Sequence, residues 1–217
     1  MIDIKIFTFN HFEVNTFVVY DDTKHCAVID PGMEFDSECR ALEEFISSNA
    51  LIPEAVLLTH THIDHVAGLR FVTEKYSIPA YLHPDAMEIL RQSEIYGSVM
   101  GFNAGNLSDV RTLFINDGDI ITFGNSELEA RYVPGHAAGS MAYCLHSLKT
   151  VFTGDALFCQ SIGRTDLPTG DYDLLIEKLK QRILPLPDDY RIYPGHGPSS
   201  SIGFEKQHNP FVQHLFN

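Results

Sequence analysis

The chain has 217 residues and a mass of 24.4 kDa, the size of one large domain. Its hydrophobic content of 44% and charged content of 20% are typical of soluble globular proteins and exclude an intrinsically disordered chain. Asp and Glu number 29 against 15 Lys and Arg, so the net charge is −14. Lys and Arg form no clustered run, and such an acidic surface disfavours nucleic acid as a partner.

Cysteine usage and the N-terminal pattern indicate a cytoplasmic protein. The four cysteines are far apart and form no C-x-x-C pair, which favours a reducing compartment over a disulfide framework. Residues 1–10 alternate apolar and polar side chains, a pattern that predicts a first strand rather than a signal peptide. No apolar run approaches about 18 residues, so we expect no membrane-spanning segment.

Hydrophobic periodicity predicts strands and helices that alternate along the chain. Strands are expected at residues 2–6, 16–20, 27–29, 55–58, 80–82, 120–123, 128–133, 141–145, 151–153 and 191–193. Helices are expected at residues 36–48, 69–76, 84–91 and 172–184.

The pattern is weaker between residues 93 and 108, which are rich in glycine and asparagine. We interpret this segment as a loop or a short helical insertion, in the place where a lid would lie. No linker or charge run divides the chain, so residues 1–217 are expected to form a single domain. Strand-rich stretches with single helices between them predict sheets at the centre and helices outside.

The segment His60-Thr61-His62-Ile63-Asp64-His65 places four potential metal ligands within six residues, directly after a predicted strand. Side chains at positions i and i+2 of an extended segment point the same way, so His60 and His62 can reach one ion. Asp64 and His65 follow where the chain should turn into a helix, and can face a second ion. Taken alone, the segment could also be a surface run of polar residues.

Three further ligand-type residues stand next to glycine at the ends of predicted strands: His136 in P-G-H, Asp155 in T-G-D and His196 in P-G-H. Glycine lets the backbone turn sharply and brings each side chain to the edge of a sheet. Singly, each could be a hydrogen-bonded turn residue. Together with the histidine-rich segment they supply the second half of a two-metal site, and imidazole and carboxylate ligands without thiolate suit Zn²⁺, Fe or Mn.

These motifs, in this order, resemble those of the metallo-β-lactamase fold superfamily, and within it the glyoxalase II-like hydrolases. The resemblance extends over most of the chain. It includes Val28-Ile29-Asp30-Pro31-Gly32, similar to the family's first turn, and residues 161–166, similar to its loop after the aspartate. It implies an α/β fold in which an αββα sandwich carries the metal site at one edge of its two sheets.

The resemblance also implies the ligand set and the reaction. His60, His62 and His136 would hold one metal ion; Asp64, His65 and His196 would hold another; and Asp155 would bridge the two, with Asp64 as the catalytic carboxylate. Two Zn²⁺ ions are expected, with Fe or Mn as alternatives, and a bridging hydroxide would attack a small anionic thioester or ester.

Asp30 and Arg164 each allow two interpretations. Asp30 either orients a ligand histidine or belongs to a plain Asp-Pro-Gly turn. Arg164 either pairs with Asp166 to stiffen its loop or attracts a carboxylate of the substrate.

The expected substrate is S-lactoylglutathione or another thioester. Full-length glyoxalase II enzymes carry a C-terminal helical domain that contacts glutathione, whereas 21 residues follow His196 here. We therefore expect no separate glutathione-binding domain and a high KM. The alternatives are a persulfide dioxygenase with one iron, whose G-R-T-D loop this chain shares, and a hydrolase of another ester or a lactone. β-Lactamases with a zinc-binding cysteine are poorer models, because aspartate occupies position 155.

Overall fold

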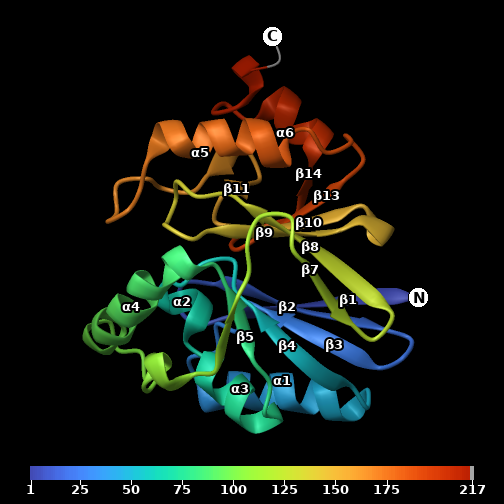
Figure 1. Cartoon of the computed structure of the whole chain (residues 1–217), viewed down its shortest axis with the longest axis vertical. Coiled ribbons are helices and arrows are strands. Elements are labelled where there is room, and N and C mark those ends of the chain that lie inside the picture. The colour runs from blue at the N-terminus through green and yellow to red at the C-terminus, as the bar shows by residue number, and fades with distance from the viewer. Residues whose placement is uncertain (216–217) are drawn as a thin grey trace.

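The computed structural model describes residues 1–215, and two six-stranded sheets form its centre (Figure 1). The first sheet contains, in spatial order, β1 (Ile2–Phe9), β2 (Val14–Asp21), β3 (His25–Ile29), β4 (Ile52–Leu57), β5 (Ala80–Leu82) and β6 (Thr112–Phe114). β1, β2 and β3 pair antiparallel, whereas β3 to β6 run parallel. Parallel strands end at the same edge of the sheet, and β4 therefore delivers the histidine-rich segment to that edge.

The second sheet is mostly antiparallel. It contains, in spatial order, β14 (Ser200–Ser201), β13 (Arg191–Pro194), β10 (Thr150–Gly154), β9 (Met141–Leu145), β8 (Ser126–Tyr132) and β7 (Ile120–Phe123). β10 and β13 are the parallel pair, so the residues that follow them emerge side by side. A separate hairpin, β11 (Leu157–Phe158) and β12 (Ser161–Ile162), follows β10.

Helices cover the outer faces of both sheets (Figure 1). The helices are α1 (Asp36–Ser48), α2 (Ile63–Val66), α3 (Leu69–Tyr76), α4 (Met87–Val99), α5 (Tyr172–Lys178) and α6 (Ile202–His208). α1 and α3 lie against the first sheet, α5 and α6 lie against the second, and α2 and α4 lie at one side (Figure 1). This arrangement confirms the expected αββα sandwich. None of the helices within residues 1–215 combines the length and apolar character that a membrane span requires.

The alternation of side chains in the central strands explains why the two sheets and their helices pack in layers. In β3, Cys26 and Val28 belong to the cluster shared with α1 and α3, whereas Ala27 and Ile29 belong to the cluster between the sheets. All four are completely buried. A strand covered on both faces needs apolar residues at every position, as β3 has from Cys26 to Ile29.

The fourth helix differs from its prediction. Residues 84–86 form a 3₁₀ turn, and α4 then continues to Val99 instead of ending near Arg91. Ser93 Oγ donates to the carbonyl oxygen of Thr61 at 2.6 Å, and a side chain at Gly97 would come within 2.6 Å of Ile63 Cδ1. Gly97 is thus a contact point between α4 and α2, although a glycine inside a sequence pattern suggests the end of a helix. The predicted helix end at Arg91 is therefore wrong, because residues 93–99 continue the same helix.

Asp21 at the end of β2 connects the two sheets through the turn between β7 and β8. Its buried carboxylate accepts hydrogen bonds from Asn125 N at 2.7 Å, Ser126 Oγ at 2.8 Å and Thr23 N at 2.9 Å. Burial disfavours the charged form, but the hydrogen bonds from Thr23, Ser126 and Asn125 outweigh it and lower the pKa of Asp21 to about 2.

Asp21→Ala should lower the free energy of unfolding at pH 7 by roughly 1–3 kcal/mol, because buried donors lose their acceptor. Because the folded pKa lies below the unfolded one, this stabilisation is present above about pH 4 and is lost as the pH falls through about 2. Urea unfolding of both proteins at pH 7, 4 and 2.5 measures the difference. A difference that stays constant down to pH 2.5 contradicts the assignment.

Candidate metal centre

The seven predicted ligands come together at one edge of the two sheets. His60 and His62 lie in the extended segment after β4, and Asp64 and His65 lie in α2. His136 follows β8, Asp155 follows β10, and His196 follows β13. The site therefore draws on both sheets, and the parallel pairing of β10 with β13 places Asp155 next to the turn that carries His196.

Two glycines allow the backbone to pass close to these side chains. Gly154 has φ +50°, and a Cβ there would lie 2.4 Å from Thr59 Oγ1. A Cβ at Gly195 would lie 2.2 Å from Asp155 Oδ1. Gly154 thus allows the sharp turn expected from the sequence, whereas Gly195 is required because a larger residue would displace Asp155, a reason that the sequence did not indicate.

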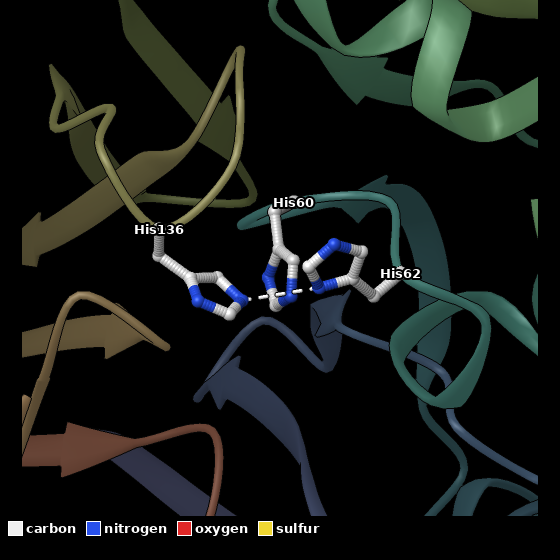
Figure 2. A group of neighbouring side chains, drawn as sticks. All are labelled: His60, His62 and His136. Atoms are coloured by element: carbon white, nitrogen blue, oxygen red, sulfur yellow. Dashed lines mark hydrogen bonds between the residues drawn. The ribbon is translucent and has the colours of Figure 1, made fainter. Parts of the chain in front are cut away.

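His60, His62 and His136 form the first group (Figure 2). Figure 2 shows the three imidazoles converging from two separate segments of the chain. His136 Nε2 lies 3.0 Å from His62 Nδ1. The ring centroid of His60 lies 4.7 Å from that of His62 and 4.9 Å from that of His136. The ligand atoms of the group all lie within 4.8 Å of one another.

Asp64, His65 and His196 form the second group. His196 Nε2 lies 3.1 Å from Asp64 Oδ2 and 3.3 Å from His65 Nε2. Asp155 stands between the two groups, because its Oδ2 lies 3.6 Å from His136 Nε2 and 3.7 Å from His196 Nε2. The two groups therefore lie side by side, with the Asp155 carboxylate between them.

Backbone carbonyls orient two of the histidines. His136 donates its Nδ1–H to the carbonyl oxygen of Arg164 at 2.8 Å, and His196 donates its Nδ1–H to that of Phe12 at 2.9 Å. A carbonyl oxygen only accepts hydrogen bonds, so the proton of each neutral ring is held on Nδ1. The lone pair of each Nε2 then points to the centre, as metal coordination requires.

Asp30 orients a third histidine from a fully buried position. Its Oδ1 accepts a hydrogen bond from Thr59 N at 2.7 Å, and its Oδ2 accepts from Thr59 Oγ1 at 2.5 Å and lies 2.9 Å from His65 Nδ1. Because the Thr59 hydroxyl donates to Asp30, its oxygen is free to accept from His60 Nδ1, 3.2 Å away. Of the two interpretations of Asp30, the structure shows the contact with a ligand histidine.

The two groups differ in charge. Burial and the neighbouring imidazoles lower the pKa of His60 well below its ordinary value, and burial and His136 lower that of His62 to about 4. These imidazoles are neutral at pH 7 and offer lone pairs. Burial also disfavours charge on His65, but three surrounding carboxylates outweigh it and raise its pKa well above the ordinary value. The second group thus stabilises positive charge.

The described residues fit a bound cation. His60 Nε2 and Asp155 Oδ1 are buried at the centre, and neither has a hydrogen-bond partner among residues 1–215. Within the same range, no lysine or arginine forms an ion pair with Asp30, Asp64 or Asp155. The ligand separations of 3.0–3.7 Å are close to the roughly 3.3 Å expected between ligands of a tetrahedral ion with bonds of about 2.0–2.1 Å. A metal ion would satisfy these two unpaired atoms and would balance carboxylates whose ion-pair partners are histidines.

Arg164 lies at the rim with its side chain 61% exposed. Its Nε and Nη2 donate to the two carboxylate oxygens of Asp166, both at 2.7 Å. The ion pair between Arg164 and Asp166, one of the two interpretations of Arg164, is therefore formed. The backbone carbonyl of Arg164 orients His136. Neither this carbonyl nor that of Phe12 was predicted, because a backbone acceptor has no side-chain pattern. Thr59 was missed as well, although it directly precedes His60.

Comparison with known proteins agrees with this geometry. The family model described as "Metallo-beta-lactamase superfamily" matches residues 10–196. The chain is 34% identical over 212 residues to the hydroxyacylglutathione hydrolase GloC of Haemophilus influenzae, a match covering 97% of this chain and 98% of that protein.

Two solved structures are similar over nearly their whole length. The crystal structure of TTHA1623 in a di-iron-bound form has a TM-score of 0.85 and 32% identity, covering 96% of this chain and 100% of that one. That of the BLEG-1 B3 metallo-beta-lactamase has a TM-score of 0.84 and 33% identity, covering 97% and 99%. The chain therefore belongs to the metallo-beta-lactamase superfamily, as an enzyme of its metallo-hydrolase class.

Proposed function

We propose that the protein is a thioester hydrolase of the glyoxalase II type, acting on S-lactoylglutathione or a close relative. The observation that carries the proposal is the position of Asp155 between two complete three-residue ligand groups. The similarity to a hydroxyacylglutathione hydrolase over nearly the whole of both chains supports the choice of substrate.

The proposed cofactors are two divalent transition-metal ions, Zn²⁺ in the first instance, with Fe or Mn as alternatives. His60, His62 and His136 would hold one ion, and Asp64, His65 and His196 the other. When bound, the ions supply Lewis acidity and lower the pKa of a coordinated water towards neutrality. TTHA1623, which is similar over nearly its whole length, is described with two irons, and the ligands here suit either metal.

The chain's own residues then position the reactants. Asp64 is the proposed catalytic carboxylate, because its side chain keeps 15% exposure and can accept a hydrogen bond from an attacking water. Asp155 would fix the separation of the two groups. A thiolate is a good leaving group, so the reaction needs no strong general acid.

We further propose that Arg164 attracts a carboxylate of the substrate. Arg164→Ala should then raise KM and leave the melting temperature almost unchanged, because both partners of its ion pair are exposed. Asp166→Ala is the matched control, since it removes the same ion pair and keeps the cation. An equal loss of stability in both variants with an unchanged KM would show that the pair is structural.

The proposal is tested with protein loaded with two equivalents of zinc or iron. S-lactoylglutathione, glutathione persulfide and a penicillin are offered separately, and thiol release, oxygen uptake and β-lactam opening are followed. We expect thiol release from S-lactoylglutathione that disappears in Asp155→Ala. Oxygen consumption with the persulfide and no thioester cleavage would reject the hydrolase and favour the persulfide dioxygenase. Opening of the β-lactam alone would favour a β-lactamase, the activity for which the BLEG-1 B3 metallo-beta-lactamase is named.

A further inference from the structure

Glu205 in α6 is a fully buried carboxylate that holds the β11–β12 hairpin. Its Oε2 accepts hydrogen bonds from Gln160 N and from Asn209 Nδ2, both at 2.8 Å, and its Oε1 accepts from Ser200 Oγ. Asn209 Nδ2 also donates to the carbonyl oxygen of Ser161 at 3.0 Å. Two side chains of the C-terminal segment therefore hold two consecutive residues of the hairpin.

The hairpin needs this external support. Gln160 lies in its turn with φ +56°, a left-handed conformation that is unfavourable for a residue other than glycine. Each strand has two residues, so the ladder between them is short. The backbone N–H of Gln160 finds its acceptor in the buried carboxylate of Glu205, on another element.

The hairpin lies against three of the candidate metal ligands. Asp155 lies two residues before the start of the hairpin, and a Cβ at Gly163, just after the hairpin, would lie 1.9 Å from the carbonyl oxygen of Asp155. The backbone carbonyl oxygen of the next residue, Arg164, accepts the Nδ1–H of His136. The ring of Phe158 in β11 lies 6.3 Å from that of His196. A shift of the hairpin would thus disturb ligands in both groups.

We propose that Glu205, together with Asn209, is a positioning residue for the metal centre. It acts through the hairpin on His136, Asp155 and His196, and contacts no candidate ligand itself. The proposal rests on the metal centre of the proposed function and not on its substrate.

The test compares Glu205→Ala with Glu205→Gln in the full chain. The alanine variant should bind Zn²⁺ about 10–100-fold more weakly in competition with a chromophoric chelator, the usual effect of losing support behind a ligand. Its Co²⁺ absorption spectrum should also change. Glutamine should restore both, because its amide oxygen can accept from Gln160 and Asn209 while its NH₂ donates to Ser200.

Asp21→Ala is the matched control, because Asp21 is also a buried carboxylate that holds a hairpin turn. It should lose stability and keep wild-type zinc affinity and Co²⁺ spectrum. Glu205→Ala with wild-type zinc affinity would overturn the proposal, and if that variant fails to fold, the same measurements on Asn209→Ala decide. Wild-type protein that binds metal but cleaves no thioester would reject the proposed substrate and leave this proposal intact.

Discussion

Asp155→Ala is expected to lower kcat/KM for the proposed thioester substrate by on the order of a thousand-fold or more, and to reduce metal content at both groups. The Asp155 carboxylate lies within 3.7 Å of a nitrogen in each group, and its Oδ1 is buried without a hydrogen-bond partner among residues 1–215. Two metal ions held by these groups would supply several kcal/mol of transition-state stabilisation, and each 1.4 kcal/mol is about tenfold in rate.

Metal per chain after dialysis, measured by elemental analysis beside the steady-state kinetics, tests this expectation. Asp64→Ala is the informative comparison, because Asp64 contacts His65 and His196 and belongs to the second group alone. It should retain close to one ion, whereas Asp155→Ala should retain less than one. Wild-type protein that stays metal-free after growth with zinc and iron would reject the metal centre, and two ions retained by Asp155→Ala would reject the bridge.

The layers of the fold could be predicted because their signals lie in single segments. The amphipathic spacing of α1 and α3 gave both helices their observed bounds, Asp36–Ser48 and Leu69–Tyr76. β6, the β11–β12 hairpin and β14 were missed. Strands of two or three residues are stabilised mainly by the strand beside them. Two of the three side chains of β6 are exposed, so its sequence shows no alternation of apolar and polar residues from which a strand could be predicted.

That the seven candidate ligands lie together could be predicted for a different reason. Imidazole and carboxylate groups beside glycine at strand ends carry their chemistry in their own side chains, and strands that end at the same edge bring them together. The groups that orient them leave no such trace. Phe12 and Arg164 act through carbonyl oxygens, and Glu205 acts on a hairpin 45 residues away in the sequence. Their roles depend on tertiary contacts that no local pattern encodes.

Asp30→Asn is expected to weaken metal binding at the second group by about 10–100-fold while the protein remains folded. Asp30 has φ +49°, a left-handed conformation that asparagine tolerates, and the amide oxygen can still accept from Thr59 N. The NH₂ group would replace Oδ2, which lies 2.9 Å from His65 Nδ1. That nitrogen would then accept instead of donating, so the proton of the neutral ring would move to Nε2, where the metal needs a lone pair.

The tautomer of His65 makes this prediction separable from a simple loss of stability. Nitrogen-15 chemical shifts of the histidine rings, recorded on both proteins after zinc is added, should report a proton on Nδ1 and a metal-bound Nε2 of His65 in the wild type, and an Nε2 without metal in Asp30→Asn. Asp21→Asn is the control, because it replaces another buried, hydrogen-bonded carboxylate away from the centre. If Asp30→Asn binds two zinc ions as tightly as the wild type, Asp30 does not set the tautomer of His65, and its role reduces to holding Thr59 at the end of the strand.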